Sequence, residues 1–485
     1  MLKLPSRRLR RSSNKPMIYL LITITVVFFL LNFQISRGDY LSPGPIFCLV
    51  FLASEIVVAA GQEAFHVILH PVTVGVLSLG FATFTFVMWL VQRKQLRPEG
   101  PAPGSFLSGP RKKPQAIDVP EFWVWLLILV EIVTVYTFYK YLKDLMVAYD
   151  VFPKSMTERI NLYDKLSKFM PKLYERLGVG LPMIYRLGNP ITNAGAFIML
   201  YVLVYNFSAV RKIKLSHLIA VGLMCVLIVM NGSRSPLLRV MTMALIMFYI
   251  LECRNGRIRR GDPRLLKWVA ILLIVVVIAS IVLLVFMGRT DSDRDYFKYG
   301  FIYAGAPIVN LDTYLTHKKP DYGHQIIGAQ TFRTFWNYMG KLFHVEHLRF
   351  GNINKFAFSR NKIEIGNVYT MFYPILYDFN IWGVIPLTGL MAWFYGRTYR
   401  RAERKPRNGK FDFRLFLYGY LFNDLLFAFF SCRFYETIGD APFLKMVIVS
   451  WIFVKVIIED CWNINRFVRN PRLLSKRYRA AHPCA

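Results

Sequence analysis

The sequence is short of acidic residues and of cysteine, and both shortages exclude functions. It holds 29 Asp and Glu against 61 Lys and Arg, and its six cysteines are scattered without the spacing of a zinc site or a disulfide framework. No phosphate-binding loop, nucleotide-binding fold signature, Asp-x-Asp metal motif or Ser-His-Asp order is present. These absences argue against a metal centre and against an enzyme that takes its donor from a nucleotide.

Long apolar runs fill most of the chain instead. Of its 485 residues 55% are hydrophobic and only 19% are charged. Many runs approach the ~20 residues with which a helix crosses ~30 Å of hydrocarbon. Helices satisfy their own backbone hydrogen bonds, which a bilayer requires. We therefore predict an all-α polytopic membrane protein, with a single integral membrane domain over residues 1–485.

About eleven transmembrane helices are expected. They cover residues 17–33, 45–60, 72–91, 121–141, 192–210, 218–230, 237–251, 268–287, 371–395, 413–430 and 444–458. Lys and Arg cluster in short segments between these runs, which by the positive-inside rule face the cytoplasm. They include a loop at 93–120 and a tail at 460–485. Residues 143–189 and 288–366 then form outer loops, the larger of which carries short helices.

The net charge of +32 indicates membrane lipids as partners rather than nucleic acid. The basic residues lie beside apolar runs, where anionic head groups attract them, and no nucleic-acid recognition module accompanies them. One point stays open. Three spans before the first inner loop would place the basic N-terminus outside, so either a run is re-entrant, a short span lies near residues 64–69, or the N-terminus is an exception.

Three arginines are placed where an anionic lipid-linked substrate would meet the membrane. Arg234 lies in a polar turn, Arg239 is one turn inside the following span, and Arg289 directly follows the eighth span. A guanidinium at membrane depth usually faces a cavity or a partner, and its planar donors match a diphosphate. The alternative for Arg234 is a side chain that reaches out to lipid head groups.

The large outer loop holds further candidates, among them His324 and Arg333. A neutral histidine can act as general base toward a sugar hydroxyl. Glu346, Glu364 and Asp378 compete with the loop histidines for that role. His344 and His347, three residues apart, are weak evidence for a metal, because no carboxylate stands at ligand spacing.

One segment resembles a known family. Gly366-Asn-Val-Tyr-Thr370, which leads into a late span, followed by Asp378-Phe-Asn380 and Gly383, resembles the Wzy-type oligosaccharide repeat-unit polymerases of O-antigen and capsule assembly. Gly232-Ser-Arg234 and the segment 303–315 look similar too. Asn380 departs from the pattern, because the family commonly has glycine there.

The resemblance implies a fold shared with O-antigen ligases and a metal-independent membrane glycosyltransferase without cofactors. Lipid-linked oligosaccharides would be its substrates, and a flippase and a chain-length regulator would be partners at the bacterial cytoplasmic membrane. The arginines would neutralise the leaving undecaprenyl diphosphate, while Asn367, Tyr369, Thr370 and Asp378 would bind substrate. An O-antigen ligase and a transporter remain alternatives, although the sequence has no internal repeat typical of transporters.

Overall fold

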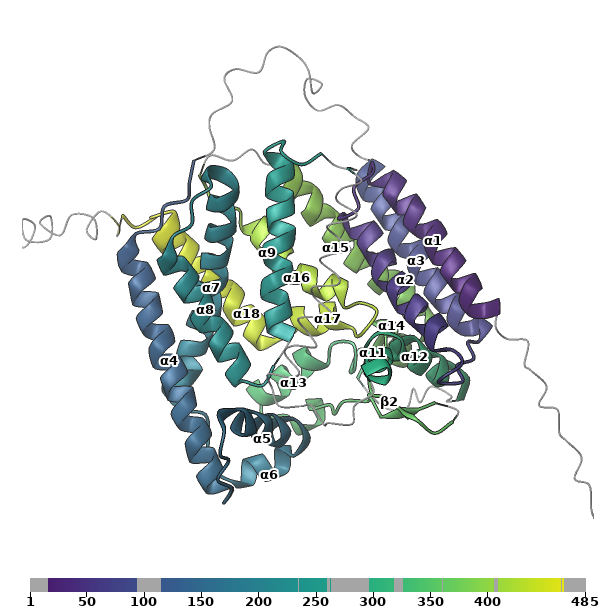
Figure 1. Cartoon of the computed structure of the whole chain (residues 1–485), viewed down its shortest axis with the longest axis horizontal. Coiled ribbons are helices and arrows are strands. Elements are labelled where there is room, and N and C mark those ends of the chain that lie inside the picture. The colour runs from purple at the N-terminus through teal and green to yellow at the C-terminus, as the bar shows by residue number, and fades with distance from the viewer. Residues whose placement is uncertain are drawn as a thin grey trace, which may run out of the picture. The chain divides into compact units, whose positions relative to one another are not determined.

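The computed structural model describes residues 16–93, 115–233, 235–259, 262, 296–317, 326–359, 361–404, 409–463 and 465. The eighth predicted span, Arg234, Arg289 and His324 lie outside these residues. The described chain is mostly helical, and eight of its helices are long and apolar enough to cross a membrane (Figure 1). The prediction of an all-α, multi-pass membrane protein is therefore confirmed.

The predicted number of eleven spans stays a prediction. The eight helices are Met17–Ile35, Pro43–Gly61, Pro71–Arg93, Glu121–Ala148, Met183–Val210, Ser235–Arg254, Phe372–Glu403 and Ala441–Ile458. Two further predicted spans are shorter helices, α8 (Leu215–Met230) and α16 (Phe413–Leu426).

The chain forms two compact units. Unit 1 comprises residues 1–94, 295–396 and 424–436, and unit 2 comprises the remainder. Unit 1 contains α1 (Pro16–Ile35), α2 (Pro43–Gly61), α3 (Pro71–Arg93), α11 (Tyr296–Ala304), α12 (Ala306–His317), α13 (Arg333–Leu342), η1 (Glu346–Leu348), β1 (Ala357–Phe358), β2 (Glu364–Gly366), α14 (Phe372–Phe379) and η2 (Asn380–Gly383). Unit 2 contains α4 (Glu121–Ala148), α5 (Met156–Phe169), α6 (Pro171–Arg176), α7 (Met183–Val210), α8, α9 (Ser235–Arg254), α18 (Ala441–Phe453) and η3 (Val454–Ile458). Two helices, α15 (Val384–Arg404) and α17 (Arg433–Ile438), begin in unit 1 and end in unit 2, and α16 begins in unit 2 and ends in unit 1.

The first part of the predicted large outer loop is packed into the core of unit 1. Helices α11 and α12 lie against α2 and α3. The Phe301 ring stacks on Phe65 with centroids 3.9 Å apart, and Ile308 and Leu311 are fully buried. At the start of α3, the Asp312 carboxylate accepts hydrogen bonds from the His70 and Thr73 side chains. Among the described residues of this loop, the segment 349–356 has the irregular structure expected of a loop, and it leads into the antiparallel pair β1–β2.

The smaller predicted outer loop of unit 2 is also helical. Helix α5 begins at Ser155, whose hydroxyl accepts the Glu158 amide, while the Glu158 carboxylate accepts the Lys154 amide. Residues of α4, α5 and α7 then share a core cluster that contains Phe138, Tyr163 and Tyr185. This packing holds α5 beside the end of α4.

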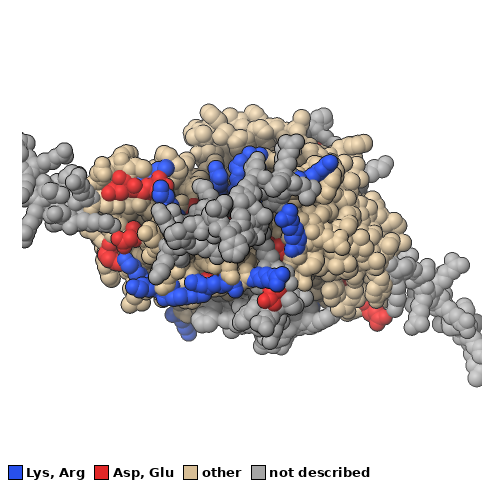
Figure 2. Space-filling model, turned by 90° about the horizontal axis from the view of Figure 1, so that it is seen from above, with Lys and Arg blue, Asp and Glu red and all other residues tan. Residues whose placement is uncertain are grey.

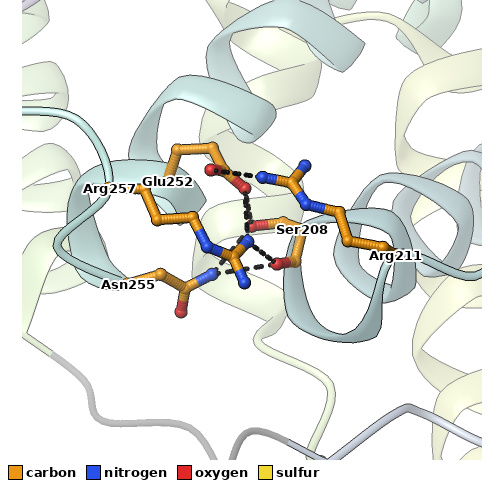
Figure 3. Close-up of polar contacts among 5 residues, drawn as sticks. All are labelled: Ser208, Arg211, Glu252, Asn255 and Arg257. Atoms are coloured by element: carbon orange, nitrogen blue, oxygen red, sulfur yellow. Dashed lines mark hydrogen bonds and ion pairs between the residues drawn. The ribbon is translucent and has the colours of Figure 1, made fainter.

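A buried carboxylate joins the C-terminal ends of α7 and α9 in unit 2. Glu252 accepts hydrogen bonds from Ser208 Oγ at 2.8 Å, Arg211 Nη2 at 3.0 Å and Arg257 Nη1 at 3.2 Å, and Asn255 donates to Ser208 (Figure 3). Lys and Arg predominate over Asp and Glu on the described part of the face seen in Figure 2. A carboxylate that pairs with two guanidiniums lets this basic end pack without repulsion.

Candidate active-site cleft

A polar cleft lies within unit 1, between α13, the segment 352–354, the start of α14 and the start of α17. Its lining residues border about 300 Å³ of space, part of which is open to solvent. Its lining is Gln330, Arg333, Asn352, Ile353, Asn354, Tyr369, Thr370, Tyr373, Pro374, Ser431, Cys432 and Glu436. Amides, hydroxyls, one guanidinium and one carboxylate thus converge on one space, the set of groups that recognises sugars and phosphates.

Stacked aromatic rings form one wall of the cleft. The Tyr369 and Tyr373 rings lie 4.2 Å apart at 19°, and Tyr314 meets Tyr373 edge-on at 4.7 Å. Tyr369 is 8% exposed, and burial raises the pKa of its phenol. The hydroxyl therefore stays protonated at neutral pH.

Four side chains hold the irregular segment that forms another wall. The hydroxyl of Tyr369 donates to the Lys355 carbonyl at 3.0 Å, and that of Tyr373 donates to the Ile353 carbonyl at 3.3 Å. Gln330 Nε2 donates to the Gly351 carbonyl at 3.3 Å, and the Asn337 side chain bonds both backbone groups of Phe350. Because these bonds replace those of regular secondary structure, Asn352 and Asn354 are held in place beside the cleft.

The sequence Gly366-Asn-Val-Tyr-Thr370 reaches the cleft through a turn that requires glycine. Gly366 has φ of +83°, and a β-carbon there would lie 3.0 Å from Ile302. The fully buried Asn310 of α12 donates to the Val368 carbonyl at 2.8 Å. The two segments singled out in the sequence, 303–315 and 366–370, are therefore joined directly in unit 1.

Arg333 and Glu436 are the charged pair of the cleft. Arg333 Nη2 lies 3.9 Å from Glu436 Oε1, and their side chains are 22% and 31% exposed. Thr334, the next residue of α13, donates to the Glu436 carbonyl at 2.7 Å. This bond ties the start of α13 to α17, so the guanidinium and the carboxylate share one wall while both remain open to a ligand.

Asp378 holds the chain beside the cleft through hydrogen bonds to backbone amides. Its carboxylate accepts the amide of Thr331 at 2.6 Å and the amide of Gln330 at 3.1 Å. These amides precede α13 by one turn, so the carboxylate fixes where that helix begins. Asp378 is not among the lining residues. These bonds position the residues before α13, and substrate binding by Asp378 stays a prediction.

The predicted site residues fall into three groups. Arg333, Tyr369 and Thr370 line the cleft, and Thr370 is fully buried. Asn367 is half-buried and does not line it. Arg239 belongs to unit 2, where its guanidinium lies over the Tyr420 ring at 4.4 Å and Nη2 donates to Thr437 Oγ1 at 3.4 Å. Arg234, Arg289 and His324 lie outside the described residues.

Neither His344 nor His347 lines the cleft. His344 and His347 are exposed, as are the competing carboxylates Glu346 and Glu364. Within the ranges given above, no three His, Cys, Asp or Glu residues come together as metal ligands would. Glu436 is the carboxylate among the lining residues.

Sequence reasoning missed Glu436, Gln330, Asn352 and Asn354. The available signal was Gly351-Asn-Ile-Asn354, in which two amides alternate in an irregular segment, and a polar turn after an apolar run that ends near residue 430. Neither signal says which distant segment it meets. No protein-family model, curated protein or solved structure matches the chain.

Proposed function

We propose that this protein is a membrane glycosyltransferase that polymerises oligosaccharide repeat units carried on undecaprenyl diphosphate at the outer face of the bacterial cytoplasmic membrane. The observation that carries the proposal is the convergence of Arg333, Tyr369 and Thr370 with Glu436 on one cleft. The sequence singles out Arg333 as a catalytic candidate and Tyr369 and Thr370 as substrate-binding candidates, and these two segments are more than 30 residues apart.

The reaction needs one base and one cation. A hydroxyl oxygen of the acceptor repeat attacks the anomeric carbon of the donor glycan, and the bond from that carbon to the diphosphate oxygen breaks. Undecaprenyl diphosphate leaves with the electron pair, and the acceptor proton passes to the base. A carboxylate serves as this base where it lies within hydrogen-bond reach of the hydroxyl.

Each role has a residue in the cleft. The Glu436 carboxylate takes the acceptor proton. The Arg333 guanidinium stabilises the negative charge that grows on the leaving diphosphate, an electrostatic role that often dominates transfer catalysis. Asn352 and Asn354 provide hydrogen bonds for sugar hydroxyls, and the hydrogen bonds that hold their segment in place lower the entropic cost of orienting them.

The test replaces Glu436 without changing its shape. The purified full chain receives lipid-linked repeat units, and polymer length is read on gels. We expect Glu436→Gln to reduce polymerisation by about 100-fold or more, because general-base catalysis contributes about 10²–10⁴-fold. Membrane abundance is measured for every variant.

Glu346→Gln is the matched control, since Glu346 is an exposed carboxylate of unit 1 that does not line the cleft. It should polymerise at the wild-type rate. Full polymerisation by Glu436→Gln at normal abundance would remove the base from the mechanism. Transfer of the glycan to a lipid A core acceptor, with no polymer formed, would identify a ligase instead.

A further inference from the structure

An apolar groove runs along unit 2 between α4 and α8. Its lining residues border about 800 Å³ of space, part of which is open to the surroundings. Its lining residues are Ile132, Val135, Tyr136, Tyr139, Met156, Leu223, Val226 and Met230. The α4 residues follow an i, i+3, i+4, i+7 pattern and therefore share one face of the helix. On each helix the first and last lining residues are seven positions apart, a distance of about 10 Å along the helix axis.

Two cations meet at one end of the groove. Lys143 follows Tyr139 by one helical turn, and its Nζ lies over the Tyr139 ring, 4.6 Å from the centroid. Arg159 of α5 follows the lining residue Met156 by three residues and interacts with the Tyr139 hydroxyl. Both side chains thus converge on the same lining residue. Among the described ion pairs, none joins Lys143 or Arg159 to a carboxylate.

We propose that this groove binds an anionic phospholipid, with one acyl chain along α4 and α8 and its phosphate at Lys143 and Arg159. The apolar lining alone would accept the chain of any lipid. The paired cations discriminate between head groups, because they attract a net negative charge and repel the trimethylammonium of a zwitterionic lipid. The site is separate from the cleft of unit 1, so it does not depend on the proposed function.

The position of the cations along α4 fits this occupant. Tyr139 and Lys143 stand in the last part of a 28-residue helix that is long enough to cross the membrane, and α5 packs beside that end. A tyrosine and a lysine near the end of a spanning helix lie at the depth of head groups. The apolar lining from Ile132 to Val135 lies deeper along the helix, where an acyl chain would run.

The test measures lipid binding to the full-length chain by native mass spectrometry. The protein is titrated with phosphatidylglycerol and phosphatidylcholine of identical acyl chains. We expect one phosphatidylglycerol to bind about tenfold more tightly than phosphatidylcholine. The double variant Lys143→Gln with Arg159→Gln should lower this preference to less than twofold.

The matched control is Lys140→Gln with Lys165→Gln, which removes the same charge from exposed positions of the same two helices. It should keep the preference. Equal binding of both lipids by the wild-type protein would overturn the proposal, and so would loss of the preference in the control.

A second pair of variants tests the groove itself. Val226→Trp fills it and should weaken phosphatidylglycerol binding about tenfold, whereas Val133→Trp, at an exposed position of α4 that does not line it, should not. If Val226→Trp leaves lipid binding unchanged but dissociates a dimer of the chain, the groove is a protein interface and the lipid assignment is wrong.

Discussion

Two arginines predicted as catalytic residues have different surroundings in the two units. Arg333 of unit 1 lines a polar cleft with Glu436 at 3.9 Å. Arg239 of unit 2 lies in a spanning helix, with its guanidinium over the Tyr420 ring and a bond to Thr437. The arginine expected from membrane depth is thus held by protein groups. The one at the start of α13 lines the cleft, where its side chain is 22% exposed.

The two arginines show that burying a guanidinium and presenting it to a ligand have different requirements. A guanidinium at membrane depth requires a partner, and an aromatic face supplies one, at about 0.5–2 kcal/mol. Such a partner leaves less of the charge for a ligand. A guanidinium beside a cleft, whose neighbour is a carboxylate 3.9 Å away, keeps donors available to incoming phosphate oxygens.

Of the two arginines, Arg333 is expected to show the larger effect. Because a lysine cannot reproduce the planar pair of donors, Arg333→Lys should reduce polymerisation about 100-fold, the cost of removing one donor from a developing negative charge. Polymer length and membrane abundance are measured together. Arg259→Lys, an exposed substitution in the basic segment of unit 2, should have no effect. If Arg333→Lys makes polymer of wild-type length at normal abundance, the catalytic role proposed for Arg333 is wrong, and it no longer differs from Arg239.

The contrast also shows how far the sequence could lead. Apolar runs and basic segments were sufficient for the helical membrane architecture, since both act locally along the chain. They were not sufficient for the segment 296–317. Its polar residues suggested a loop, yet Asn310 and Asp312 are buried because each satisfies backbone or side-chain donors of another segment. Tertiary partners of this kind leave no periodic signal.

The residues of the cleft also depend on tertiary partners that the sequence does not reveal. Tyr369 and Thr370 were identified because they stand in a recognisable motif, whereas Glu436 stands in none. Asp378, in the same motif, accepts amides of residues 330 and 331. Which residue touches substrate and which positions another depends on pairings across about 50 residues or more, and these come from the fold.

A smaller effect is expected at Arg239. The sequence alone predicts that Arg239→Lys loses most polymerisation at normal abundance, because only arginine pairs with a diphosphate in a bidentate manner. With the structure, we expect a loss of less than tenfold, since a lysine ammonium can also lie over the Tyr420 ring. The same gel assay decides between them. A 100-fold loss of polymerisation at normal abundance would favour the sequence-based prediction that Arg239 pairs with the diphosphate.

The smallest effect concerns the residue at which the family resemblance fails. Asn380 ends α14 with φ of +56° and ψ of −163°, a region that glycine adopts without strain and other residues at about 1–3 kcal/mol. Its own Oδ1 accepts the Ile381 amide at 2.7 Å, which offsets part of this cost. Asn380→Gly should therefore raise the thermal unfolding midpoint by a few degrees, and Asn380→Ala should lower it.

Polymerisation by Asn380→Gly should stay at the wild-type level, because Asn380 does not line the cleft. If Asn380→Gly is less stable than the wild-type protein while Asn380→Ala is neutral, then the asparagine side chain contributes more than the backbone strain costs, and the glycine of the family pattern has another reason.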